Sequence, residues 1–124
     1  MEKGVLVIGG GIAGMQAALD LADSQYQVFL VEKNPSIGGK MAQLDKTFPT
    51  NDCSMCIIGP KLVECSRHLN IEIVTYADIE TVEGSLGDFR VKIKKRARSI
   101  DLDLCTGCGS CVENCPVTNQ AVTT

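Results

Sequence analysis

Residues 4–14 read Gly4-Val5-Leu6-Val7-Ile8-Gly9-Gly10-Gly11-Ile12-Ala13-Gly14, an apolar run that ends in a glycine-rich turn. Such a continuous apolar run is typical of a buried parallel strand. Residues 12–23 then place apolar side chains at helical spacing, and residues 27–32 form a second apolar run. A strand, a glycine turn, a helix and a strand in this order predict an α/β protein built on a βαβ unit with a right-handed crossover.

The glycine turn fits the pattern Gly-x-Gly-x-x-Gly between the predicted strand and helix. In that context Gly9 allows the tight turn, Gly11 lets a pyrophosphate approach the backbone, and Gly14 lets helix and strand pack closely. The start of the helix also presents free N–H groups and the positive end of its dipole to the phosphates. The pattern therefore predicts a dinucleotide-binding site.

An acidic residue follows where such a site needs one. Glu32 ends the second apolar run, 21 residues after Gly11, and an acid there favours a ribose with a free 2′-hydroxyl. The run from Glu32 to Gly39 has the form Glu-Lys-x-Pro-x-x-Gly-Gly, which resembles the second fingerprint of flavoproteins related to the disulfide reductases. The resemblance implies a Rossmann-like FAD-binding unit, with these candidate cofactor-binding residues: Gly9, Gly11, Ile12, Ala13, Gly14, Glu32, Lys33, Gly38 and Gly39.

The rest of the chain is expected to divide into two parts. Residues 1–100 form a partial FAD-binding domain of the two-dinucleotide-binding type, and residues 101–124 form an incomplete ferredoxin-type segment, because the sequence becomes rich in glycine and cysteine from Asp101. Within the first part we expect an irregular loop over 33–58, a short helix from Pro60 to about Arg67, a third strand over 71–75, and a β-hairpin with strands 79–84 and 88–95.

The strongest motif is Cys105-x2-Cys108-x2-Cys111-x3-Cys115-Pro116, which matches the bacterial ferredoxin run. It predicts a 4Fe–4S cluster, since zinc sites usually join two separated cysteine pairs. In two-cluster ferredoxins the fourth cysteine of such a run serves the other cluster. The fourth ligand is therefore expected from sequence beyond residue 124, from another chain or from an unusual local arrangement.

Three further cysteines allow three interpretations. Cys53 and Cys56 form a C-x2-C pair, and Cys65 follows nine residues later. They could ligate a second cluster, with Cys115 as the fourth ligand. The pair could instead be a redox disulfide, or all three could be inert.

Composition excludes several classes of protein. The 124 residues carry a net charge of −3, so no general attraction to nucleic acid is expected. No apolar run approaches the ~18 residues expected of a membrane span. The seven cysteines, the tight spacings and the absence of an export signal favour a cytoplasmic protein that ligates metal rather than one held by disulfides.

Residues 9–23, 31–57 and 105–116 together closely resemble the flavin and iron–sulfur subunit of heterodisulfide reductase, which occurs in methanogens, sulfate reducers and their relatives. The resemblance implies an oxidoreductase subunit that holds FAD and 4Fe–4S clusters. It also implies partner subunits, in a complex where the flavin splits or merges electron pairs. Members of that family run to several hundred residues, so this chain is expected to be part of a longer or split subunit, with weak flavin retention and no turnover alone.

Two alternatives remain open from the sequence. One is an electron-wiring or assembly module that holds clusters without flavin, and the other is a thiol–disulfide oxidoreductase that uses Cys53 and Cys56. A basic stretch adds a question about partners, because it could be a solvated strand face or a docking patch for an acidic carrier such as ferredoxin. It comprises Lys92, Lys94, Lys95, Arg96 and Arg98.

Overall fold

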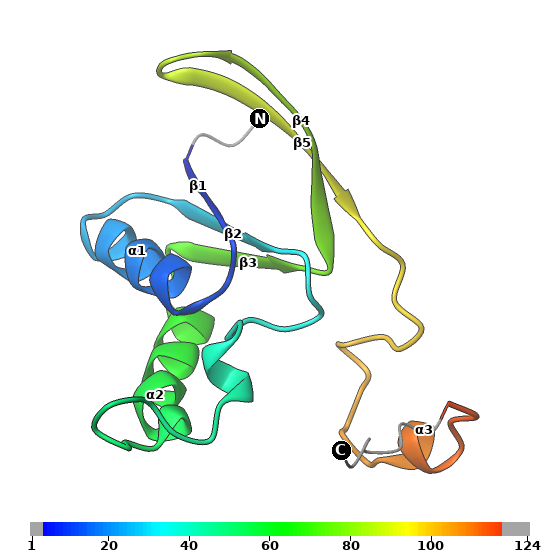
Figure 1. Ribbon diagram of the computed structural model, residues 1–124. Coiled ribbons are helices and arrows are strands. Elements are labelled where there is room, and N and C mark those ends of the chain that lie inside the picture. Colours follow the sequence, from blue (N-terminus) through cyan, green and yellow to red (C-terminus); the bar gives the residue numbers. More distant parts are fainter. Residues whose placement is uncertain (1–3, 118–124) are drawn as a thin grey trace.

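A parallel sheet of three strands forms the centre of the molecule (Figure 1). The structure is a computed structural model and describes residues 4–117. The strands are β1 (Val5–Ile8), β2 (Val28–Glu32) and β3 (Ile71–Thr75), in the order β1-β2-β3. Their apolar side chains alternate between the two faces, so each face needs its own cover.

Two helices cover one face of this sheet. α1 (Ile12–Asp23) and α2 (Ser54–Arg67) bury a core to which Met15, Leu30 and Ile58 contribute fully enclosed side chains. The face predicted for α1 is the buried one, with Met15, Ala18, Leu19 and Ala22 inside and Ile12 packed at its edge. The βαβ unit therefore forms as the apolar spacing predicts.

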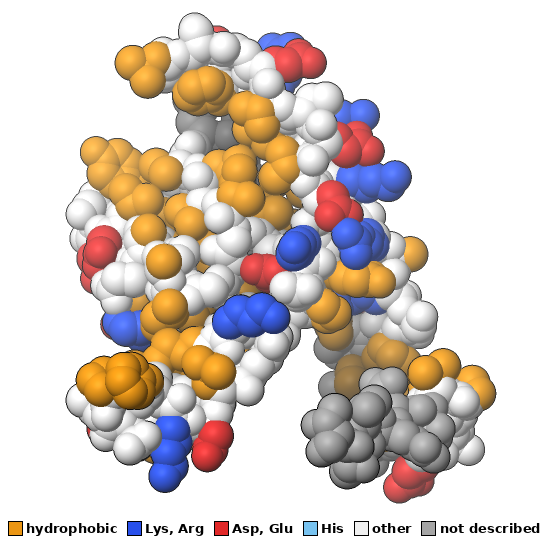
Figure 2. Space-filling view, in the orientation of Figure 1, with side chains coloured by type: hydrophobic (Ala, Val, Ile, Leu, Met, Phe, Trp, Pro, Cys, Tyr) orange, Lys and Arg blue, Asp and Glu red, His pale blue; other side chains and the backbone are white. Residues whose placement is uncertain are grey.

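A β-hairpin packs against the opposite face. β4 (Ala77–Ser85) and β5 (Asp88–Lys95) pair antiparallel, and the root of the hairpin lies over Val31 and Val74. Its tip extends beyond the sheet, and acidic and basic side chains are interleaved along its outer edge (Figure 2). Lys92 Nζ lies 2.8 Å from Glu80 Oε2, so part of the basic stretch is paired within the hairpin.

The loop predicted over 33–58 is present but ends at residue 53, so the predicted end of the loop and the predicted start of the following helix were wrong. A short 3₁₀ turn, η1 (Met41–Gln43), interrupts the loop, and α2 begins at Ser54 with Pro60 inside it. Ser54 is fully buried, and its N–H and hydroxyl donate to the carbonyl of Asp45 at 3.1 and 3.2 Å. These bonds fix the start of the helix, while Pro60 lies on its exposed side.

The chain continues from β5 into a segment of different character. Residues 101–117, here called the cysteine segment, run away from the sheet and contain the short helix α3 (Ser110–Glu113) (Figure 1). No side chain of this segment is buried within the described residues. The hydrogen bonds that the structure shows in this segment join residues close in sequence. One example runs from the N–H of Val112 to the carbonyl of Gly109 at 2.8 Å.

Candidate nucleotide site and cysteine motifs

The two glycine motifs meet at the start of α1. The N–H of Gly38 donates to the carbonyl of Gly10 at 2.7 Å. Gly39 has a φ of +57°, and a Cβ on it would lie 2.9 Å from the Cα of Gly11. Only glycine permits both this conformation and this approach without a shift of the backbone. Two segments far apart in sequence are thus brought into backbone contact.

The first glycine turn is tight on one side and open on the other. A Cβ at Gly14 would lie 1.8 Å from the carbonyl oxygen of Gly9, so helix and turn pack too closely for any side chain. A Cβ at Gly11 would meet nothing within 4 Å. Gly11 is also the N-cap of α1 and makes no side-chain cap. The open space in front of Gly11 thus faces free helical N–H groups, which is an arrangement that suits an anion.

Glu32 closes the turn from the end of β2. Its side chain is buried, and its carboxylate accepts from the N–H of Gly10 at 2.6 Å and from the N–H and side-chain amide of Asn34 at 2.8 and 2.7 Å. Burial raises the pKa of Glu32, but the hydrogen bonds from Asn34 and Gly10 and the charge of Lys33 outweigh it, so the pKa lies below its ordinary value. Glu32 is therefore ionised at neutral pH.

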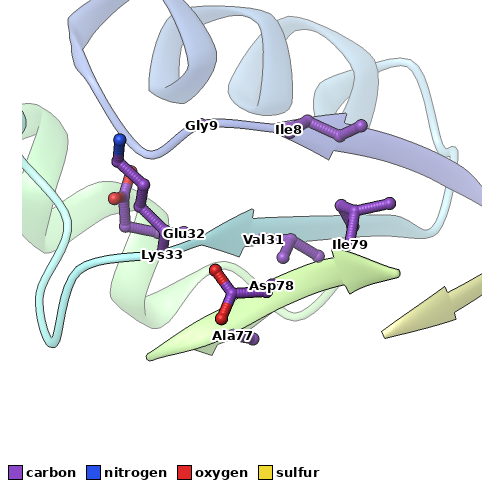
Figure 3. A pocket seen from close by; sticks show the side chains of 8 residues that line it. All are labelled: Ile8, Gly9, Val31, Glu32, Lys33, Ala77, Asp78 and Ile79. Atoms are coloured by element: carbon purple, nitrogen blue, oxygen red, sulfur yellow. The ribbon is translucent and has the colours of Figure 1, made fainter. Parts of the chain in front are cut away.

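A cavity of about 250 Å³ lies beside Glu32 (Figure 3). One side consists of the ends of β1 and β2, with Ile8, Val31 and Lys33, and the other consists of the hairpin root, Ala77–Ile79. The walls are apolar except for the charged groups at one end. Sequence reasoning missed the hairpin root as part of this site, because alternation predicts a strand but not the strand's place against the sheet.

The two cysteines at the start of α2 are exposed and close together. Cys53 is the N-cap residue, and Cys56 lies in the first turn. A hydrogen bond from the Cys56 side chain, joined by backbone N–H groups, holds the pKa of Cys53 below its ordinary value, and the same contact raises the pKa of Cys56. The structure thus brings the C-x2-C pair together.

Cys65 is placed apart from that pair. It lies nine positions further along α2 than Cys56, which corresponds to about 13 Å along a helix axis. Its side chain is fully buried, and its Sγ donates to the carbonyl of Met15 at 3.6 Å. Burial raises the pKa of the Cys65 thiol. The structure therefore does not bring Cys65 to Cys53 and Cys56, and it gives Cys65 a place in the core.

The ferredoxin-type cysteines all lie exposed on the cysteine segment, and they comprise Cys105, Cys108, Cys111 and Cys115. Gly107 and Gly109, between them, have φ values of +71° and +84°, which glycine adopts without strain. The Ser110 hydroxyl, 3.5 Å from Cys108 Sγ, lowers the pKa of Cys108. Within residues 4–117, no three metal-ligating side chains are gathered into one site.

The sequence also places the chain among known proteins. Residues 4–119 match the family described as FAD dependent oxidoreductase. The chain belongs to this family. Membership agrees with the glycine geometry at α1, and it favours FAD as the dinucleotide of this site.

Curated relatives confirm the resemblance to heterodisulfide reductase. The chain is 63% identical over 117 residues to a subunit of the H(2):CoB-CoM heterodisulfide,ferredoxin reductase of Methanothermobacter thermautotrophicus, covering 94% of the chain and 18% of the relative. It is 56% identical to the iron-sulfur subunit of the CoB--CoM heterodisulfide reductase of Methanocaldococcus jannaschii over the same shares. The chain thus spans less than a fifth of the length of these relatives.

Solved structures confirm the Rossmann-like fold. L-proline dehydrogenase from P. horikoshii superposes with a TM-score of 0.64 at 27% identity, covering 74% of this chain and 19% of that one. The thioredoxin reductase of T. acidophilum shares the fold alone, with a TM-score of 0.60 at 18% identity over 72% of this chain and 30% of that one. Among residues 4–117, none of the helices has the length and apolar character needed to cross a membrane.

Proposed function

We propose that this chain supplies the FAD-binding part of an oxidoreductase subunit similar to the flavin and iron–sulfur subunit of heterodisulfide reductase. In this proposal it transfers electrons between the flavin and iron–sulfur clusters, in the cytoplasm, within a complex of several subunits. The observation that carries the proposal is the backbone contact between the two glycine motifs, where Gly38 bonds to Gly10 beside the open space at Gly11.

The residues present fit the adenosine and pyrophosphate of FAD. The pyrophosphate would lie in the open space at Gly11, against the free N–H groups of α1 and beside Gly39. The ribose would lie at Glu32, and the adenine would fill the cavity between β2 and the hairpin root. When bound, FAD supplies both two-electron and one-electron redox chemistry.

Glu32 has one acceptor position left for this task. A carboxylate offers about four acceptor positions. Three are used by the N–H of Gly10 and by the two donors of Asn34. The fourth would accept a ribose hydroxyl, and the charge that the hydrogen bonds maintain would repel a 2′-phosphate. Lys33 lies beside Glu32 and also lines the cavity (Figure 3).

Titration of the chain with ADP and with FAD tests the nucleotide part. Gly11→Ala places a methyl group where the pyrophosphate would lie, yet it touches nothing in the protein. We expect its affinity for ADP to fall by roughly tenfold or more, as for a lost pyrophosphate contact, with the unfolding transition unchanged. Gly59→Ala in α2, whose Cβ also meets nothing, is the matched control. Unchanged ADP affinity in Gly11→Ala would contradict the proposal.

The cluster part of the proposal has its own support. Cysteine thiolates at the spacing of Cys105, Cys108 and Cys111 are the donor set that a 4Fe–4S cluster prefers. The left-handed glycines between them give the loop its curvature. Anaerobic reconstitution should yield roughly four irons per chain, and Cys111→Ser should abolish this while the buried Cys65→Ser should not. Roughly eight irons would add Cys53 and Cys56 as ligands of a second cluster.

A second candidate function is thiol–disulfide exchange at Cys53 and Cys56. The contact between their side chains at the start of α2, which lowers the pKa of Cys53, favours it. The pair would be oxidised to a disulfide while a disulfide of the substrate is reduced to two thiols. Alkylation of both cysteines should then abolish the reaction without changing the iron content. Loss of iron on alkylation would assign the pair to a cluster.

The partner part of the proposal rests on the relatives, each of which is named as one subunit of a reductase. We propose other subunits of such a complex as partners, with ferredoxin as a further one. The pairing of Lys92 with Glu80 and of Arg96 with Asp78 leaves fewer free charges on the hairpin for an acidic carrier. Lys95 and Arg90 on β5 would then be the charges whose reversal weakens ferredoxin binding.

A further inference from the structure

The corner between β3 and β4 consists of one residue in an unusual conformation. Tyr76 has a φ of +58°, in the left-handed region that side chains other than glycine and asparagine rarely adopt. Two guanidinium groups lie over its half-buried ring, with Arg96 Cζ 5.3 Å and Arg98 Cζ 5.4 Å from the ring centroid. Such stacks are favourable for arginine.

Hydrogen bonds tie this corner to two other segments. The N–H of Tyr76 donates to the carbonyl of Asn34 at 2.9 Å, and its own carbonyl accepts from the N–H of Arg96 at 2.9 Å. Arg98 donates to the carbonyl of Pro35 at 3.1 Å and to Thr75 Oγ1 at 2.7 Å. The corner is therefore fastened to the loop after β2 and to the chain after β5.

These contacts reach residues on both sides of the nucleotide cavity. On one side Asn34, held by Tyr76, donates twice to Glu32. On the other side Arg96, stacked on the ring, donates to both carboxylate oxygens of Asp78 at 2.6 and 2.7 Å, and Asp78 lies in the cavity wall. Figure 3 shows Glu32 on β2 and Asp78 on β4, two of the elements that line the cavity.

We propose that Tyr76 is a positioning residue, which sets the distance between Glu32 and the hairpin root and thereby shapes the cavity for an adenosine group. The proposal rests on the proposed nucleotide site and adds a determinant that does not touch the ligand. Glycine would form the same corner without strain. We infer that the arginine stack stabilises Tyr76 in its strained backbone conformation. Backbone strain of this kind is typical of functional sites, where the surrounding structure fixes the conformation.

Three variants separate positioning from simple stabilisation. Tyr76→Gly keeps the corner's backbone bonds and removes the stack, whereas Tyr76→Phe keeps the ring. Gln25→Gly is the matched control, because Gln25 has a φ of +69° in the turn between α1 and β2, away from the cavity. Both glycine variants relieve backbone strain at a positive φ. A difference in ligand affinity between them therefore comes from loss of the arginine stack.

The first readout is the affinity of the chain for ADP and for pyrophosphate, measured separately. In Tyr76→Gly we expect ADP affinity to fall by roughly tenfold, the factor that two exposed cation–π contacts supply. Pyrophosphate affinity should stay unchanged, since the glycine turn is not altered. Tyr76→Phe and Gln25→Gly should bind both ligands as the unchanged chain does. Equal ADP affinity in Tyr76→Gly and Gln25→Gly would overturn the proposal.

The second readout needs no ligand. Hydrogen exchange of the Ala77–Ile79 amides should quicken in Tyr76→Gly and not in Gln25→Gly, because the wall loses its anchor. Unchanged exchange would overturn the proposal, whatever the chain binds. If the unchanged chain bound neither ADP nor FAD while exchange quickened as expected, the proposed function would fail and the role of Tyr76 in holding the cavity wall would stand.

Discussion

Residues 4–98, here called the nucleotide domain because they contain the proposed nucleotide site, differ from the cysteine segment in what gives them order. Residues 4–98 bury two apolar clusters, one on each face of the sheet. The cysteine segment buries no side chain within residues 101–117, and Leu104 and Val112 are 79% and 74% exposed. A segment without a core has little apolar burial to offset the entropy of ordering its backbone.

The difference shows what each part needs in order to fold. The nucleotide domain encloses an apolar core made of its own side chains, and a hydrogen bond from the N–H of Gly10 to Glu32 holds the glycine turn against that core. The cysteine segment has donors and curvature but no apolar enclosure. Under the proposed function its order would come from the 4Fe–4S cluster, as in small metal-bound domains where binding free energy is folding free energy. Three predictions test this contrast.

The largest expected effect is a loss of stability when leucine is replaced by alanine, and this replacement can be made in each of the two regions. Leu30→Ala removes a fully buried side chain from β2, and Leu104→Ala removes an exposed one from the cysteine segment. Urea unfolding of the cluster-free chain should show a loss of about 2–5 kcal/mol for Leu30→Ala. It should show less than about 0.5 kcal/mol for Leu104→Ala. Comparable losses would mean that the segment packs against the domain.

A smaller effect is expected from alanine at two glycines. Gly14→Ala forces a methyl group against the carbonyl of Gly9 and should cost about 1–3 kcal/mol in unfolding free energy. Gly107→Ala meets no atom but requires a left-handed φ. It should leave unfolding of the cluster-free chain unchanged and reduce the iron bound on reconstitution. A stability loss for Gly107→Ala without iron would show that the segment is ordered by itself.

The smallest effect concerns pH and Glu32. Its pKa in the folded chain lies below the ordinary value of 4.5, so the unfolded chain takes up this proton first. The stability that this carboxylate contributes is therefore present above pH 4.5 and is lost as the pH falls through the lower folded pKa. In Glu32→Gln, the unfolding temperature should therefore fall less on acidification than it does in the unchanged chain. Glu113→Gln, on the exposed α3, is the control, and identical acid profiles for both variants would contradict the prediction.

Much of the nucleotide domain was predictable from local pattern. The βαβ unit was predicted from the run Val5–Ile8, the glycine turn and the spacing of Met15, Ala18 and Ala22. The prediction succeeded because the apolar positions at helical spacing are also the buried ones. Alternation around the turn at Gly84 and Gly87 predicted the hairpin. These features depend on neighbours in sequence, and the structure confirms them.

The errors arose where distant contacts decide the local structure. Pro60 predicts a helix that starts at its own position, because proline favours the first helical residue. The helix instead begins at Ser54, because the buried hydroxyl of Ser54 bonds back to the loop at Leu44 and Asp45. The hairpin root was missing from the predicted site for the same reason, because its contact with the sheet joins residues far apart in sequence. A signal for the longer helix was present in the spacing of Ser54, Ile58 and Cys65, which share the buried face.

The corner at Tyr76 also has a consequence for the order of folding. The hairpin joins neighbours in sequence and can form in about 1–10 μs. The parallel pairings, such as Val28 with Ile71, must first close long loops and are slower. The stack of Arg96 and Arg98 on Tyr76 joins the start of β4 to the chain just after β5, so it can form together with the hairpin and before the sheet. Losing it should therefore slow refolding and not only hasten unfolding.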